Sequence, residues 1–148
     1  MYSFTFDSNN NVTNFNTDLC GNVVVVPNKI GDTTINGIAT IFESDTITAV
    51  YIEGVENLTT LPEEFLSKTN NIKTAYIANL PKYEVVDKLN YYKASSFDLG
   101  RLQSVNKVNV SFNESNIDNV TIQNHKSLKE VINSYNTCHK LKTINISN

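Results

Sequence analysis

The chain contains few of the side chains that usually catalyse reactions or bind metal ions. Its only histidines are His125 and His139, and its only cysteines are Cys20 and Cys138. A structural zinc site needs about four Cys, His or carboxylate ligands at finger-like spacing. His125, Cys138 and His139 supply at most three ligands, so we expect no metal site.

Hydrolytic chemistry would need a nucleophile, a base held against it and a site for the developing oxyanion. Neither histidine falls in the outward-facing columns of the repeat alignment with a serine or cysteine beside it. The sequence has no Gly-x-Ser-x-Gly, Walker or Gly-x-Gly-x-x-Gly motif. Glu63 and Glu64 are adjacent acids, which we interpret as a solvated pair that complements a helical turn. The sequence therefore predicts a protein that is not an enzyme and needs no cofactor.

Charge and hydropathy argue against two further classes of partner. The formal net charge is −3, the pI is about 5.3, and Arg101 is the only arginine. Nucleic acids and anionic membranes attract concentrated Lys and Arg, which this sequence lacks. No stretch approaches the roughly 18 apolar residues of a membrane span, and residues 1–6 lack the features of a signal peptide. We expect no nucleic-acid or membrane partner, and a cytoplasmic or virion-associated location.

The elements that position the side chains are indicated by a repeat of three apolar residues, at positions p, p+3 and p+5. A second signature, apolar-x-x-apolar-x-x-x-aromatic, follows the first, as in Leu58–Phe65, Val105–Phe112 and Leu128–Tyr135. Fixed periods of about 20 to 50 residues are typical of solenoids, in which each repeat packs on its neighbours. The first signature begins, at steps of 25, 22, 23 and 24 residues, at Ile47, Ile72, Ala94, Ile117 and Leu141.

Residues 1–22 lie outside the repeat. Tyr2, Phe4 and Phe6 alternate with polar residues and precede the turn-forming residues 7–11, which predicts a β-hairpin. A solenoid needs a cover on its first coil, so we assign this hairpin as an N-terminal cap. The predicted single domain then continues, for about five and a half coils, through repeats 23–46, 47–71, 72–93, 94–116 and 117–140 and a partial repeat 141–148.

The order of these motifs resembles the BspA-type leucine-rich repeats of bacterial surface proteins. Val-Val-Pro is followed by Ile-Gly-Asp, by Ile35-x-x-Ile38-x-x-x-Phe42 and by Ile47-Thr-x-Val-x-Ile, after a short hairpin. The resemblance implies a leucine-rich-repeat solenoid of the β-rich α/β class, with a parallel sheet of short repeats. It also implies adhesion to, or recognition of, another protein.

Two segments on the other side of the coils have helical features. Within residues 82–92, Tyr83, Val86 and Leu89 recur at helical spacing, which predicts a helix. Pro62 begins a predicted single helical turn. The second signature after Val105 favours a strand, whereas the one after Leu128 is compatible with either.

Strand side chains alternate, so the residues between the apolar positions point out of the predicted sheet. Tyr51 and Tyr76, beside the acidic Glu53 and Asp98, form an aromatic patch of the kind enriched at protein interfaces. A plain cross-strand ladder of two tyrosines explains the same pair. The outward column with these tyrosines contains Tyr51, Tyr76, Asp98, Thr121 and Asn145.

The last repeat contains only its strand, in residues 141–148. An open end leaves apolar side chains and backbone donors uncovered. Three explanations fit this open end. The polar residues of the strand keep it soluble in water, another protein or another copy of the chain covers it, or the chain is truncated. We expect a non-catalytic protein-binding module, from a phage or a bacterium. The alternative is a structural subunit of a virion or surface assembly that forms a homo-oligomer through residues 141–148.

Overall fold

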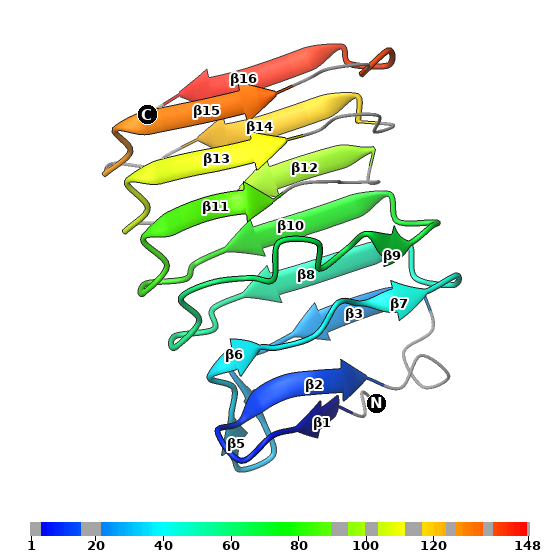
Figure 1. The fold of residues 1–148 in the computed structure, drawn as a ribbon, viewed down its shortest axis with the longest axis vertical. Helices are drawn as coiled ribbons and strands as arrows, with labels where there is room; N and C mark the ends of the chain where they lie inside the picture. Colours follow the sequence, from blue (N-terminus) through cyan, green and yellow to red (C-terminus); the bar gives the residue numbers. More distant parts are fainter. Residues whose placement is uncertain are drawn as a thin grey trace.

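The computed structural model describes residues 4–15, 22–89, 95–99, 104–111, 117–123, 127–134 and 138–147. These residues form a β-solenoid of about four stacked turns, with parallel sheets and no helix (Figure 1). The main sheet lies along one side of the stack, and a second, less continuous row of strands lies along the other. The apolar core fills the space between the two sides.

The main sheet contains six parallel strands, which lie side by side in the order β3, β8, β10, β12, β14 and β16. Adjacent strands pair without a shift, so that Val50 lies beside Ala75 and Val120 beside Ile144. As predicted, the apolar residues of the repeats that begin at Ile47, Ile72 and Ile117 are buried. The strands are β3 (Val23–Val26), β8 (Ala49–Glu53), β10 (Thr74–Ala78), β12 (Ser96–Leu99), β14 (Asn119–Gln123) and β16 (Thr143–Ser147).

The opposite side of the coils is less regular. β7 (Glu43–Ser44) pairs with β9 (Lys68–Thr69), and a separate three-stranded parallel sheet follows further along the stack. Apolar residues of the second signature point into the shared core, where Phe42 and Phe65 meet edge to face with ring centroids 6.1 Å apart. The strands of this second sheet are β11 (Val85–Leu89), β13 (Lys107–Ser111) and β15 (Glu130–Ser134).

The helix predicted over residues 82–92 is wrong for the part that the structure describes, because Val85–Leu89 is strand β11. Val85 and Val86 are β-branched residues, which favour strands, and their backbone pairs with Lys107 and Val108 of the next coil. The predicted helical turn at Pro62 is instead two successive tight turns, closed by hydrogen bonds from Phe65 N to Pro62 O and from Ser67 N to Glu64 O. Pairing between coils thus overrides the local spacing.

The N-terminal hairpin is present as predicted, although Tyr2 lies outside the described residues. β1 (Phe4–Phe6) and β2 (Asn11–Phe15) pair antiparallel, and β2 also pairs with β6 (Gly37–Ile38) of the first coil. Phe4 and Val12 are buried against the apolar interior. The hairpin therefore covers this end of the core, beyond β3 (Figure 1).

The five and a half coils predicted from the sequence exceed the number of complete turns observed. Successive strands on the two sides are β8–β9, β10–β11, β12–β13 and β14–β15. The first coil is less regular: between β3 and the short strand β7 on the other side, the chain forms the small hairpin of β4 (Lys29–Ile30) and β5 (Thr33–Thr34), and β6 joins the cap. At the other end, β16 is the last strand that the structure describes, and it pairs with β14.

Asparagine side chains connect successive coils at their corners. Asn36 Nδ2 donates to Asn9 O at 2.8 Å, Asn57 Nδ2 donates to Asn36 Oδ1 at 2.9 Å, and Lys82 Nζ donates to Asn57 Oδ1 at 2.7 Å. Asn70 Nδ2 makes a similar bond to Asp45 Oδ1 at 2.9 Å. These contacts give a structural use to several of the 23 asparagines of the sequence.

We predict a large difference between two chemically identical substitutions in the strands. Ile122 is fully buried, whereas Ile132 is 43% exposed. Ile122→Ala should lower the free energy of unfolding by about 2–5 kcal/mol, because it removes buried methyl groups and leaves a cavity. Ile132→Ala should cost less than roughly 1 kcal/mol. Urea unfolding of both variants measures the difference, and equal losses would contradict the assigned inward and outward faces.

The cap should be sensitive to a single methyl group at Gly37. A Cβ at this position would lie 2.5 Å from Asn11 Oδ1, while Asn11 Nδ2 is held by Asp7 Oδ2 at 2.9 Å. We expect Gly37→Ala to lower the free energy of unfolding by about 1–3 kcal/mol through overpacking. In an Asn11→Ala background the same change should cost much less. A double-mutant cycle tests this, and equal costs in the two backgrounds would exclude the clash.

The hairpin turn should make stability depend on pH at the acidic end. The side chain of Asn11, and then its backbone N–H and that of Asn9, donate to the Asp7 carboxylate and lower its pKa below the ordinary 3.8. Because the folded state favours the ionised form, this contribution is present above the ordinary pKa and is lost as the pH falls through the lowered value. The free energy of unfolding, measured with urea, should fall more over this pH range for the wild type than for Asp7→Asn. Parallel pH profiles would show that the turn contributes nothing.

Candidate functional site

The outward column predicted from the repeat alignment is observed in the main sheet. Tyr51 pairs with Tyr76, Tyr76 with Asp98, Asp98 with Thr121, and Thr121 with Asn145. The order follows from the unshifted register of the main sheet, in which each strand contributes the residue directly beside that of its neighbour. The structure thus brings these five predicted residues into a single row across the sheet.

The two tyrosines form the aromatic part of this row. The ring centroids of Tyr51 and Tyr76 are 6.1 Å apart and the ring planes are inclined by 53°. Tyr51 is 37% exposed, and Tyr76 is partly buried. Two tilted rings from adjacent coils present a continuous aromatic surface on a strand pair whose backbones are fixed by the ladder.

Two valines that the sequence analysis did not select extend this surface. Val25 continues the column beside Tyr51, and Val23 lies beside Ala49 in the neighbouring column, with Val23 37% exposed. Aligning the buried pair Val24 and Val26 with Val50 and Ile52 would have revealed both outward valines. We call Val23, Val25, Tyr51 and Tyr76 the aromatic patch.

Acidic residues border the aromatic patch. Glu53 follows Tyr51 on the same strand, and its Oε1 accepts a hydrogen bond from Asn79 Nδ2 of the next coil at 2.9 Å. Asp98 is the register partner of Tyr76 on the side away from Tyr51. Thr121 and Asn145 continue the column as polar residues. The outer face therefore changes from aromatic to polar along the stack.

Two small residues at outward register positions of this face are covered. Ala78 is fully buried and Ala49 is nearly so. Their methyl groups are short, and their register partners are larger: Glu53 lies beside Ala78, and Val23 and Thr74 lie beside Ala49. The accessible surface here is consequently supplied by the tyrosines and valines.

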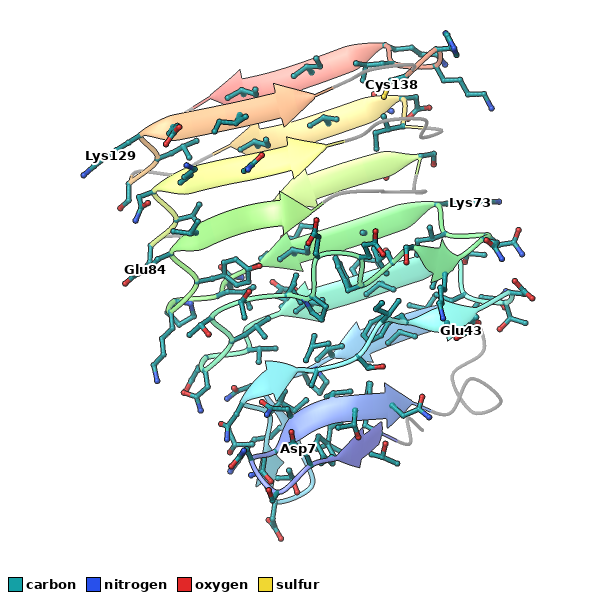
Figure 2. All side chains as sticks on the ribbon, viewed as in Figure 1. Asp7, Glu43, Lys73, Glu84, Lys129 and Cys138 are labelled. Carbon is teal, nitrogen blue, oxygen red and sulfur yellow. The ribbon has the colours of Figure 1, made fainter. Side chains whose placement is uncertain are left out.

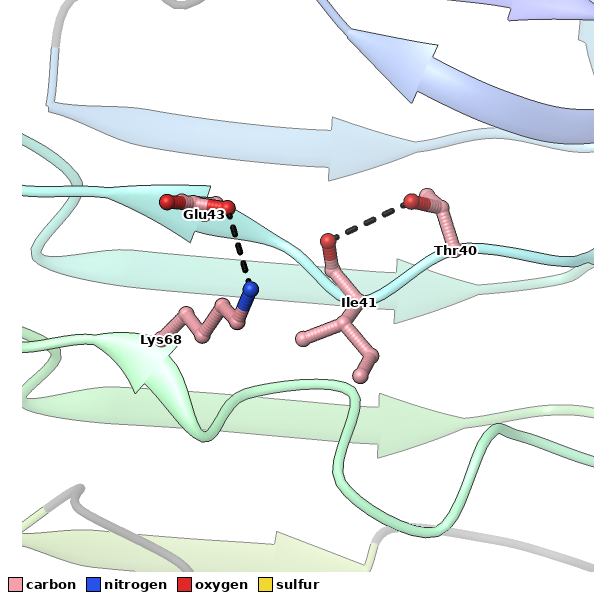
Figure 3. Close-up of polar contacts among 4 residues, drawn as sticks. All are labelled: Thr40, Ile41, Glu43 and Lys68. Atoms are coloured by element: carbon pink, nitrogen blue, oxygen red, sulfur yellow. Dashed lines mark hydrogen bonds and ion pairs between the residues drawn. The ribbon is translucent and has the colours of Figure 1, made fainter.

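A shallow polar hollow of about 370 Å³ lies on the other side of the coils, near β7 and β9. Lys68 Nζ lies 3.4 Å from Glu43 Oε2, and both side chains are exposed (Figure 3). The hollow is lined by Glu43, Ser44, Asp45, Ser67, Lys68 and Asn70. Its acids already bond to the neighbouring coil, Glu43 to Lys68 and Asp45 to Asn70. The side chains that line the hollow therefore connect adjacent coils, and its carboxylates do not point together at a position where a ligand would bind.

The residues considered for metal or catalytic chemistry are partly described. Cys138 lies in the last coil, at the opposite end of the stack from the hairpin turn with Asp7 (Figure 2), while His139 is exposed. Cys20 and His125 lie outside the described residues. Within the described part of the chain, no three His, Cys, Asp or Glu residues are grouped closely enough to hold a metal ion. None of its segments is a helix with the length and hydropathy to cross a membrane.

Comparison of the chain with protein-family models, curated proteins and solved structures found no match. The resemblance to BspA-type repeats therefore stays a prediction.

Proposed function

We propose that this chain is a non-catalytic protein-binding module whose partner docks on the outer face of the main sheet. The observation that carries the proposal is the aromatic patch, where Tyr51 and Tyr76 lie 6.1 Å apart beside two outward valines. Tyrosine is enriched at interface hot spots because it combines a large apolar ring with a polar tip.

The support beneath the patch favours tight binding. Val50, Ile52, Ala75 and Ile77 alternate with the outward residues and are buried in the core. A surface that is already ordered loses little conformational entropy when a partner binds. The patch is thus held by the same ladder that holds the fold.

The borders of the patch indicate the chemistry of the partner. Glu53 and Asp98 place carboxylates beside the tyrosines, and the chain has a net charge of −3. A Lys or Arg side chain would interact favourably with the carboxylates and with an aromatic face. We infer a partner segment that presents a basic residue next to apolar ones.

We also infer that the coils are a divergent form of the BspA-type leucine-rich repeat. The steps of 22 to 25 residues and the N-terminal hairpin support this relationship. Strand β11 replaces the helix expected in residues 82–92, and marks the divergence.

Selection from a random peptide library displayed on phage, with the immobilised chain as bait, tests the proposed function. We expect the enriched peptides to contain Lys or Arg beside apolar residues. The double variant Tyr51→Ala and Tyr76→Ala should weaken their affinity by about tenfold or more, as for interface hot spots. Glu53→Gln with Asp98→Asn should weaken it less and should reduce its dependence on salt.

A matched control uses the polar half of the same face. Asn119→Ala with Thr121→Ala removes outward side chains from β14 and should leave the affinity nearly unchanged. Peptides that bind equally well to the tyrosine variant would show that the tyrosines form only a structural ladder. In that case the variant would lose stability without losing binding.

A further inference from the structure

The sequence contains one Asn-Gly pair, Asn36–Gly37, and the structure places it where the N-terminal hairpin joins the first coil. Gly37 begins β6 and pairs with Asn11 of β2. The backbone N–H of Asn36 donates to Asn10 O of the hairpin at 3.1 Å. The pair therefore lies inside the short ladder that holds the hairpin on the solenoid.

The side chain of Asn36 contacts both sides of this junction. Its Nδ2 donates to Asn9 O of the hairpin at 2.8 Å, and its Oδ1 accepts a hydrogen bond from Asn57 Nδ2 of the next coil at 2.9 Å. Asn36 is nevertheless exposed, so that water reaches it. One amide thus connects the hairpin, the first coil and the second coil.

The residue that follows Asn36 makes its amide reactive. Glycine has no Cβ, so its backbone nitrogen approaches the preceding side chain with little steric hindrance. Once a solvent base has removed its proton, Gly37 N can attack Asn36 Cγ. The N–Cγ bond forms, the Cγ–Nδ2 bond breaks, and Nδ2 takes a proton from solvent and leaves as ammonia. Water then opens the resulting succinimide at one of its two carbonyls, which gives aspartate or isoaspartate.

The folded chain restrains this attack. Ring closure requires rotation of the Asn36 side chain and of its peptide bond to Gly37, but the side chain is held by its two hydrogen bonds. The neighbouring residues Ile35 and Ile38 are anchored in the core. Gly37 also packs closely on the hairpin, since a Cβ on it would lie 2.5 Å from Asn11 Oδ1. The attack therefore requires the hairpin to open from β6.

We propose that Asn36 is a self-modification site: local opening of the hairpin permits deamidation by Gly37, and deamidation then keeps the hairpin detached. Aspartate at this position accepts hydrogen bonds but cannot donate one to Asn9 O. Isoaspartate adds a methylene group to the backbone before Gly37, which moves Gly37 out of register with Asn11. Either product removes a contact that closes the hairpin on the solenoid.

The modification limits the lifetime of the capped fold. The hairpin buries Phe4 and Val12 against the core, so its detachment exposes them. The reaction needs only water, and the loss of ammonia is not reversed in dilute solution. The share of chains with a detached hairpin therefore grows with time, and the solenoid ages from this end.

Peptide mass spectrometry of the full chain, sampled during incubation at mildly alkaline pH, tests the proposed site. In urea, we expect Asn36 to react faster than the other asparagines. In the folded chain its reaction should be about tenfold or more slower, because it waits for local opening. Asn36→Gln keeps an amide but needs a larger ring, so it should form little product. An equal rate in folded and unfolded chains would overturn the protection by the hairpin.

A matched pair of variants separates opening of the hairpin from unfolding of the whole chain. Val12→Ala and Ile122→Ala both remove fully buried methyl groups, the first from the hairpin and the second from β14. In the folded chain, Val12→Ala should accelerate the reaction at Asn36 several-fold, whereas Ile122→Ala should leave its rate nearly unchanged. Equal acceleration by both variants would overturn the role of local opening.

Hydrogen exchange of the modified chain, separated from the unmodified chain by its additional negative charge, tests the consequence. The Ala39 N–H donates to Val12 O at 2.8 Å, and we expect it to exchange faster after modification. Exchange in β10 should not change. Asn36→Asp reproduces the aspartate product and should show a smaller acceleration than isoaspartate, because its backbone keeps the register. Unchanged exchange at the junction after complete conversion would overturn the detachment.

Discussion

The structure depends on backbone hydrogen bonds between successive coils, which in the main sheet keep an unshifted parallel register. A strand of the main sheet satisfies its backbone groups mainly through the coil before and the coil after it. Because side chains alternate along a strand, this register stacks inward residues such as Val50 and Ala75 into one ladder and outward residues such as Tyr51 and Tyr76 into another. Core and surface are therefore two consequences of one pairing pattern.

The same pattern assigns different tasks to different parts of a coil. Inward positions must be apolar, and corners favour side chains that reach the next coil, as Asn57 reaches Asn36 and Asn79 reaches Glu53. The outer face has neither requirement, so its residues can vary, from the aromatic patch to polar Thr121 and Asn145. Stacking also creates two ends. The N-terminal hairpin covers the first, whereas Ile144 and Ile146 are exposed near the second.

The outward column could be predicted from the sequence because side chains alternate between the two faces of a strand. Once the spacing of the inward residues is known, the residues between them must point outward. The patch was predicted only in part, since the first strand has four valines in a row, and Val23 and Val25 emerge only from its pairing with β8. The sequence did not predict strand β11 because Tyr83 and Val86 are three positions apart. That spacing fits one face of a helix, and it equally fits two inward residues on either side of a bend in the chain. The asparagine contacts and the approach of Gly37 to Asn11 depend on distances between coils, which a linear sequence does not contain.

The register between coils can be measured directly by nuclear magnetic resonance, through contacts between backbone protons of adjacent strands. The account predicts that Thr121 lies beside Asp98 on one side and beside Asn145 on the other. Contacts displaced by one residue would contradict it, because a shift of one position exchanges the buried and exposed faces of every strand.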